Sequence, residues 1–291
     1  MTDQLPLSVI IPVWNGEKEI PLLLDALADQ TAPADTYEVI VVDNGSSDRT
    51  VAVARDYPFV RVERETKPGS YAARNHAVAK ASGQFLLFTD ADCVPAPDWI
   101  AQALVYAKIH GDNCLVGGRI EMFRAGNSGA FSSRYDALTT GLNQEWNVRN
   151  RHCVTANWLI SKRLLVEIGM FDDTLMSGGD GECAARIADA GYPLHYAPDM
   201  LVRHPARADF RALIAKKRRV IGGRWQRADR REIGHFSRLN LDEYVNQAKW
   251  VKNSDIETVF KPGIIVMVVM IWSIIQLEII KLGAGGRPHR A

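Results

Sequence analysis

Three aspartates stand where strands of a sheet are predicted to end. Asp90 and Asp92 follow the apolar run that begins at Phe85, and Asp43 ends the run YEVIVVD. Ligands of parallel sheets bind beyond the carboxyl ends of the strands, and an extended backbone would turn Asp90 and Asp92 to the same side. Carboxylates gathered there repel one another, and Mg²⁺ or Mn²⁺ would relieve that repulsion and bridge to a diphosphate. Although an Asp-x-Asp pair alone is common in solvated turns, this placement predicts a metal site.

The segments that must position these aspartates alternate between two patterns. Four short apolar runs, rich in Val, Ile and Phe, begin at Leu7, Tyr37, Phe59 and Phe85. Nearly continuous apolarity is typical of strands buried on both faces of a parallel sheet. Between the runs, helical spacing predicts helices over 19–27, 50–57 and 71–81. A strand-helix alternation of about 25 residues predicts βαβ units, and hence an α/β fold with a mainly parallel sheet flanked by helices.

Beyond the fourth run the pattern is less regular. Ser70 is predicted to cap the third helix, and Ser47 or Asp48 the second. No element is predicted for 126–152. The remaining expected elements are a helix over 98–110, strands over 114–123 and 157–161, helices over 162–168 and 181–190, and two short strands over 194–197 and 201–204.

Composition and charge exclude some classes of protein. The formal net charge is +1, so no global field favours nucleic acid as a partner. The four cysteines are scattered, with no CxxC pair and no Cys-His spacing suited to zinc. The sequence therefore predicts a protein of a reducing, cytosolic compartment.

Six segments, in order, resemble the successive motifs of family 2 glycosyltransferases, which have the GT-A fold. They are SVIIPVWNGEKEI, VIVVDNGSSDRT, KPGSYAARNHAVAKASG, FLLFTDADCVPAPDWI, TANWLISKRLLVEIGMFDD and GGDGECAARIADAGYPLHY, and the resemblance covers residues 6–205. It implies an inverting transferase that moves a sugar from a nucleotide donor, with a UDP-sugar as the donor class. The motifs are specific for the fold and much less so for the substrate.

The resemblance also implies which residues bind the donor nucleotide. Pro12, Trp14 and Asn15 match the loop that holds the base and ribose, and Glu17 matches a nearby polar contact. Asp43 matches the carboxylate that hydrogen-bonds the uracil or ribose. Structural roles remain open for two of these residues, since Trp14 could pack in the core and Glu17 could make no donor contact.

Two further motifs continue the same implied site. Arg74 and Asn75 match an ARN element near the donor. An arginine in the first turns of a helix suits a diphosphate through its charge and the free N–H groups there, although Arg74 could instead form a surface ion pair. By the same resemblance Asp90 would contact ribose or sugar, and Asp92 would be a ligand of Mn²⁺ or Mg²⁺.

Sugar transfer needs a base, because the acceptor hydroxyl must lose its proton as it attacks. The resemblance implies that this carboxylate is Asp180, in the segment GGDGECAAR, with Glu182 as a second acidic position. The sequence departs from the common pattern at Gly179, where a glutamate usually precedes the aspartate. The choice between Asp180 and Glu182 therefore stays open, as does a role for Asp180 as a helix cap only.

His204, in the segment LVRHPAR, follows the last predicted strand. It resembles a histidine that completes the metal site in many GT-A enzymes, and imidazole is a suitable ligand of Mn²⁺. A single histidine often has no such role, so both possibilities stay open.

The C-terminal third combines a basic run with an apolar one. The run KKRRVIGGRWQR spans 216–227, and the resemblance implies that Arg224 and Trp225 contact donor phosphates, a lipid diphosphate or anionic headgroups, whereas a solvated basic helix is the alternative. Residues 263–280 are largely apolar, and an 18-residue helix is about 27 Å long against about 30 Å of hydrocarbon. Glu278 lies near the end of this run, where a carboxylate could reach headgroups. Since no polar face is evident, a span or re-entrant helix is favoured over a surface helix and over a tail buried against a protein partner.

The sequence thus predicts a metal-dependent glycosyltransferase at the cytoplasmic face of a membrane, acting on a lipid-linked or polysaccharide acceptor. We expect a catalytic domain over 1–210, a basic helical extension over 211–258 and a membrane-associated helix and tail over 259–291. A nucleotidyltransferase of the same fold is disfavoured, because PVWNGEKE after the first strand lacks the glycine-rich, basic loop that holds a triphosphate. An inactive partner that only binds nucleotide and membrane is disfavoured by the presence of Asp92 and Asp180.

Overall fold

The computed structural model describes residues 6–124, 130–139, 141–228, 232–254 and 256–288. The chain divides into two compact units. The first comprises Met1–Glu121, Leu142–Leu175 and Gly179–His204, and the second comprises Met122–Gly141, Met176–Gly178 and Pro205–Ala291. The expected division into 1–210, 211–258 and 259–291 stays a prediction, since it concerns what each segment does.

One eight-stranded sheet forms the centre of the first unit. Its strands are β1 (Leu7–Val13), β2 (Tyr37–Asp43), β3 (Val60–Arg64), β4 (Phe85–Phe88), β5 (Val94–Pro95), β6 (Leu115–Phe123), β7 (Trp158–Ser161) and β8 (Leu194–Pro205). Their spatial order is β3-β2-β1-β4-β7-β6-β8-β5. The first four are parallel, whereas β7 runs antiparallel to β4 and β6, and β5 antiparallel to β8. The parallel βαβ pattern expected from the sequence thus makes one half of the sheet.

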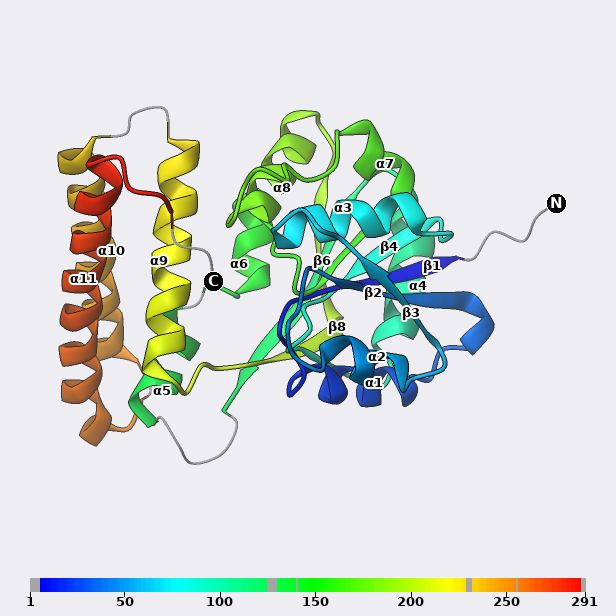
Figure 1. Ribbon diagram of the computed structural model, residues 1–291, viewed down its shortest axis with the longest axis horizontal. Helices are drawn as coiled ribbons and strands as arrows, with labels where there is room; N and C mark the ends of the chain where they lie inside the picture. Colours follow the sequence, from blue (N-terminus) through cyan, green and yellow to red (C-terminus); the bar gives the residue numbers. More distant parts are fainter. Residues whose placement is uncertain (1–5, 125–129, 140, 229–231, 255, 289–291) are drawn as a thin grey trace. The chain divides into compact units, whose positions relative to one another are not determined.

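Helices cover both faces of this sheet (Figure 1). One face carries α1 (Ile20–Ala28), α2 (Thr50–Arg55) and α4 (Trp99–His110), and the other carries α3 (Ser70–Lys80), α7 (Lys162–Glu167) and α8 (Gly179–Asp189). In β1, Val9 and Ile11 pack in the first layer and Ile10 packs in the second. Because adjacent strand residues point to opposite faces, a strand covered on both sides is apolar throughout. The α/β fold class is confirmed.

Two details of the predicted elements were wrong. Residues 194–205 form the single strand β8 in place of two short strands, because β8 lies between β6 and β5 and these neighbours hold it extended. Ser70 is the first residue of α3 and not its cap; the preceding Gly69 has a φ of 130°, which favours glycine. Of the residues without a predicted element, 130–139 form α5 and 144–149 form α6, whereas 125–129 and 140 lie outside the described residues.

The second unit is helical. It contains α5 (Ala130–Thr139), α9 (Phe210–Arg227), α10 (Ile233–Asn253) and α11 (Lys261–Gly283), and Figure 1 shows α9, α10 and α11 as long helices side by side. One face of α11 lies in their shared apolar core, together with Tyr135, Leu213 and Tyr244. The core residues of α11 are Ile264, Val268, Ile271, Ile275, Ile279 and Leu282.

Glu278 also lies on the buried face of α11. Its side chain is 1% exposed, with the Arg218 guanidinium at 2.7 Å and the Lys281 ammonium at 3.0 Å. A buried carboxylate without such partners would be strongly destabilising. The expected contact of Glu278 with membrane headgroups was therefore wrong, and this residue joins α9 to α11.

Candidate active site

The two aspartates after β4 lie in a tight turn. Residues 91 and 92 form the turn, and the Cys93 amide donates to the Asp90 carbonyl at 3.1 Å. The expected extended backbone was therefore wrong, and the two carboxylates have different partners. Arg74, whose side chain is only 3% exposed, donates to Asp90 Oδ1 at 2.5 Å. Because Arg74 is buried, the alternative of a surface ion pair is excluded.

Strand pairing brings His204 to Asp92. β5 begins two residues after Asp92, and its Val94 pairs with Arg203 of β8, so that His204 Nε2 lies 3.6 Å from Asp92 Oδ1. His204 is buried and Asp92 is partly exposed, which leaves a carboxylate oxygen accessible beside an imidazole nitrogen. These are ligand types that bind Mn²⁺. The residues present therefore fit a divalent cation that takes its other ligands from water or a diphosphate.

Cys93 is the third member of this cluster, since its sulfur and the ligand atoms of Asp92 and His204 all lie within 4.8 Å of one another. Burial, together with the nearby Asp92 and Asp90 carboxylates, raises the pKa of the Cys93 thiol well above its usual value. Mn²⁺ and Mg²⁺ prefer oxygen and nitrogen ligands to sulfur. The donor set of this site is thus the oxygen and nitrogen of Asp92 and His204.

Asp43 is not part of the same cluster. Its side chain is buried at the end of β2, where Oδ1 accepts from the Ser46 amide at 3.0 Å and Oδ2 lies 3.8 Å from Arg64 Nε. The expected convergence of Asp43, Asp90 and Asp92 on one ion is not seen among the described residues. The physical reason is that Asp43 and Asp90 have cationic and amide partners of their own.

The β1–α1 loop is tied to the loop after β2. Asn15 has a φ of 50°, and its side-chain oxygen accepts from the Ser47 amide at 2.8 Å. Glu17 accepts from the Arg49 amide at 3.0 Å. Asn15 and Glu17 thus have structural contacts whether or not they also touch a donor. Trp14, in contrast, is 43% exposed, which rules out the alternative that it packs in the core.

Pro12 and Asp48 are two further residues that the sequence singled out near β1 and β2. Pro12 is half-buried in β1 and pairs with Val42 of β2. Asp48 accepts from the Thr50 amide at 3.1 Å, but Arg49 occupies the N-cap position of α2, so the sequence did not place this cap correctly.

The two candidate bases differ in their partners. Glu182 accepts from Arg186 at two positions, Nε at 2.6 Å and NH2 at 3.0 Å, and this hydrogen bond raises the pKa of Arg186. Asp180 lies in the first turn of α8, where it accepts from the Tyr71 hydroxyl at 3.1 Å. Asp180 Oδ1 also accepts from the Gly181 amide at 2.9 Å. The two carboxylates thus differ in their partners, and which of them is the base stays a prediction.

Sequence reasoning missed the residues that surround Asp180. Tyr71 comes from α3, and its ring lies against Gly179. A Cβ atom at Gly181 would lie 1.9 Å from His152 Cε1, so His152 packs directly on the first turn of α8. The only signal was the pair of glycines on either side of Asp180, which indicates close approach of neighbouring groups. Gly179, the departure from the common family pattern, makes room for Tyr71.

Arg224 and Trp225 lie in the second unit. Arg224 forms an ion pair with Glu243 of α10, and the Trp225 ring packs against Phe236 with centroids 4.8 Å apart. Trp225 is buried, so it serves the core of this unit. Their expected contact with phosphates stays a prediction.

The first unit has a parallel half-sheet with an acidic turn at its strand ends, then antiparallel strands, and then a helix whose first turn carries a carboxylate. This arrangement defines a GT-A glycosyltransferase. The family model described as glycosyl transferase family 2 matches residues 8–169. The chain is also 37% identical over 259 residues to glycosyltransferase AglE of Haloferax volcanii, a match that covers 86% of this chain and 82% of AglE. The chain belongs to the family 2 glycosyltransferases.

Other known proteins share part of the sequence or the fold. Pre-mycofactocin glycosyltransferase of Mycobacterium tuberculosis is 30% identical over 222 residues, which cover 72% of this chain and 45% of that protein. A mannosyltransferase of Pyrobaculum calidifontis, solved with GDP-Man and Mn²⁺, has a TM-score of 0.60 at 22% identity and covers 98% of this chain and 74% of its own. TarS 1-349 of S. aureus, solved with UDP, has a TM-score of 0.54 at 21% identity and covers 91% and 71%. The likeness to these two structures shows the fold alone.

Asn15 and Trp14 should respond differently to substitution. Asn15→Ala should lower the free energy of unfolding by about 1–2 kcal/mol, because it removes the hydrogen bond to Ser47 and strains a left-handed backbone. Asn15→Gly should cost less, since glycine keeps that backbone, and Trp14→Ala should change stability by less than about 0.5 kcal/mol. Urea unfolding measures all three. Equal losses for Asn15→Ala and Trp14→Ala would contradict the structural role of Asn15.

Proposed function

We propose that this glycosyltransferase moves a sugar from a UDP-sugar to a lipid-linked or polysaccharide acceptor, with inversion, at the cytoplasmic face of a membrane. The observation that carries the proposal is the pairing of Asp92 with His204 at 3.6 Å, which offers the oxygen and nitrogen ligands of a divalent cation. Mn²⁺ or Mg²⁺ would be held by these two residues. When bound, the ion neutralises charge on the departing nucleoside diphosphate.

The donor would bind along the carboxyl edge of the parallel strands. Pro12 lies in β1, Trp14 and Asn15 follow it in the β1–α1 loop, and Trp14, which is 43% exposed, would stack on a base. Asp43 would accept hydrogen bonds from the base or ribose, and Glu17 would lie nearby. UDP is favoured as the nucleotide because TarS was solved with it, although the mannosyltransferase was solved with GDP-Man.

Arg74 and Asp90 would act as a pair. The Arg74 guanidinium is buried and bonded to Asp90, and it also lies 5.7 Å from the centre of the Tyr71 ring. A fixed, paired guanidinium can still donate to a phosphate, because it has five N–H groups in a planar fork. Asp90 would thus orient Arg74 as well as contact the ribose or sugar.

Asp180 would be the base. It would take the proton from the acceptor hydroxyl as that oxygen attacks the anomeric carbon from the side opposite the leaving diphosphate, which inverts the configuration. Tyr71 would hold the Asp180 carboxylate in position through its hydroxyl. Glu182 would instead hold Arg186, whose guanidinium also donates to the Met170 carbonyl at 2.6 Å.

Membrane association would occur through α11. The helical segment Thr258–Gly283 is long and apolar enough to cross a membrane, a criterion of length and composition only, and 39% of its most apolar window is buried. Opposite its buried face, α11 exposes a second apolar face formed by Val266, Val269, Met270, Leu277 and Ile280. A helix packed on one side and apolar on the other supports insertion into the membrane interface over an isolated span. The acceptor proposal depends on this association.

The metal assignment is tested by UDP binding. Asp92→Asn and His204→Gln should each reduce the gain in UDP affinity that Mn²⁺ provides by at least about tenfold, because each removes one ligand. Calorimetry with and without Mn²⁺ measures this gain. Cys93→Ala is the matched control and should keep the gain, since sulfur is a poor ligand for Mn²⁺. If Asp92→Asn keeps the full benefit of Mn²⁺, the site lies elsewhere.

The base assignment is tested by turnover. Asp180→Asn should leave UDP affinity near that of the unaltered protein and lower the turnover of a UDP-sugar by about 10²-fold or more, the usual contribution of general base catalysis. Glu182→Gln should have a smaller effect on turnover and should reduce thermal stability, because it weakens the bond to Arg186. The reverse pattern would make Glu182 the base. Undiminished turnover in both variants would contradict the mechanism.

The membrane proposal is tested by flotation with vesicles of phosphatidylcholine and phosphatidylglycerol. The triple substitution Val266→Ser, Met270→Ser and Leu277→Ser should weaken binding by at least about tenfold, because it removes apolar surface without touching the buried face of α11. The matched control substitutes three exposed apolar residues of the first unit, Leu22, Val105 and Ile109, with serine. Full-length protein that stays soluble in the absence of detergent and does not float would contradict the proposal.

A further inference from the structure

A second group of metal-ligating side chains lies away from the Asp92–His204 pair. His110 is the last residue of α4, Cys114 immediately precedes β6, and His195 is the second residue of β8. The Leu115 amide donates to the Pro193 carbonyl at 3.1 Å, which joins the start of β6 to the start of β8. This contact brings His195 to His110 and Cys114, although it follows them by more than 80 positions in the sequence.

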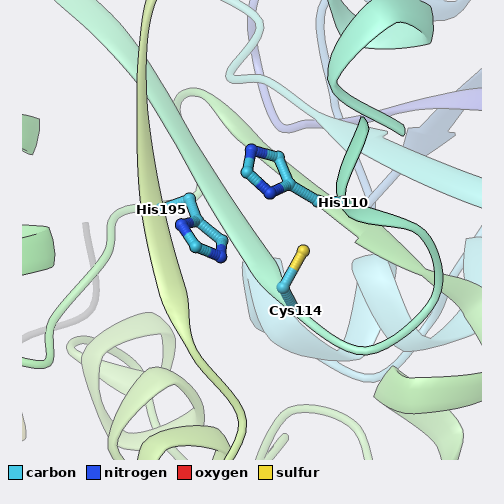
Figure 2. Close-up of side chains that lie close together, drawn as sticks. All are labelled: His110, Cys114 and His195. Atoms are coloured by element: carbon cyan, nitrogen blue, oxygen red, sulfur yellow. The ribbon is translucent and has the colours of Figure 1, made fainter. Parts of the chain in front are cut away.

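The three side chains converge in space. Their ligand atoms all lie within 4.8 Å of one another, and Figure 2 shows the Cys114 sulfur pointing toward the two rings. The rings of His110 and His195 are stacked, with centroids 4.0 Å apart and an interplanar angle of 17°. Tyr106 stacks beside His110 at 6.0 Å. Cys114 is buried and the two histidines are half-buried, so the group is held in place yet open to solvent on one side.

We propose that His110, Cys114 and His195 bind one Zn²⁺ ion. Two imidazole nitrogens and one thiolate are the ligand types that zinc prefers over Mg²⁺ and Mn²⁺. Zinc lies about 2.0–2.1 Å from nitrogen and about 2.3 Å from sulfur, so tetrahedral ligand atoms are about 3.3–3.7 Å apart. Because the two rings are stacked, their in-plane nitrogen lone pairs run side by side, and each ring would turn about its side-chain bonds for the ligand atoms to reach these separations. The Cys114 thiol gives its proton to solvent as the bond forms, and a water molecule takes the fourth position.

The site would stabilise the first unit. A single ion would link the end of α4 to the starts of β6 and β8, and it would close a long stretch of chain that is open in the unfolded state. β8 is also the strand that carries His204. Zinc at one end of β8 would thus hold the strand that supplies a residue to the Asp92 site, although the two ligand sets share no residue.

A purely structural role for the stacked rings is the alternative outcome. Imidazole stacking and burial of a thiol also stabilise a protein without any ion. The two cases differ in whether Zn²⁺ binds and whether it needs Cys114, and neither depends on the sugar donor.

The test uses full-length, metal-free protein from which any polyhistidine tag has been removed. In Asp92→Asn protein, which lacks a ligand of the other cation site, one equivalent of Zn²⁺ should bind and raise the melting temperature by several degrees, as expected for a ligand well above its Kd. Co²⁺ in place of Zn²⁺ should give a thiolate-to-cobalt charge-transfer band. Cys114→Ser should abolish that band, and His195→Gln should weaken Zn²⁺ binding by at least about tenfold.

Two controls test whether the effects of Zn²⁺ and Co²⁺ are specific to this site. Cys183→Ala removes another buried, free cysteine and should leave the cobalt band and Zn²⁺ affinity unchanged. Cys114→Ser should keep the gain in UDP affinity that Mn²⁺ provides. Because Cys114 is buried and its variant could fail to fold, the half-exposed His195→Gln gives an independent reading of the same site. Failure of the unaltered protein to bind Zn²⁺, or a cobalt band that persists in Cys114→Ser, would overturn the proposal.

Discussion

The central strands β1 and β4 lie between two layers of helices. Because successive side chains point to opposite faces of the sheet, each strand must present apolar side chains to both layers. In β1, Val9 and Ile11 serve one layer while Ile10 serves the other. A charge inside such a strand would be buried without a partner, which is costly. The central strands β1 and β4 accordingly contain no ionisable residue, Asp43 ends β2 and Asp90 follows β4, whereas Arg61 and Glu63 lie inside the edge strand β3, where they pair with each other. This requirement concentrates the chemistry of the first unit on one edge of its sheet.

The carboxylates of the candidate site differ in the side chains that they contact. Asp90 is bonded to a buried guanidinium and Glu182 to Arg186. Asp92 faces an imidazole, and Asp180 faces a phenol. Residues of the same chemical type thus have different surroundings, and this difference supports the separate roles proposed for Asp92 and Asp180.

In the second unit, a charged side chain inside an apolar helix likewise has ion-pair partners. α11 has two apolar faces, one in the core with Ile271 and one exposed with Met270. Glu278 interrupts the buried face, where it pairs with Arg218 of α9 and Lys281 of α11, so Arg218 accounts for part of the basic character of α9. The basic run of 216–227 therefore does not consist only of charges free to meet phosphates. Several of its cations are partners of acids within the unit, as Lys216 is of Asp136.

The sequence by itself determined the elements and their class. Apolar runs without alternation can be fully buried only between two layers of helices, so the first four strands and the helices between them were predictable. The order of six motifs indicated the family. The carboxyl ends of those strands also gave Asp43, Asp90 and Asp92 as candidates. What the sequence could not give was the set of neighbours of each side chain, because these come from distant segments. The turn at Asp90, the approach of His204 to Asp92 and of Tyr71 to Asp180, and the meeting of His195 with Cys114 all depend on strand pairing and helix packing. Contacts between segments so far apart in the sequence form only in the tertiary structure, because local residue spacing does not specify which segments become neighbours.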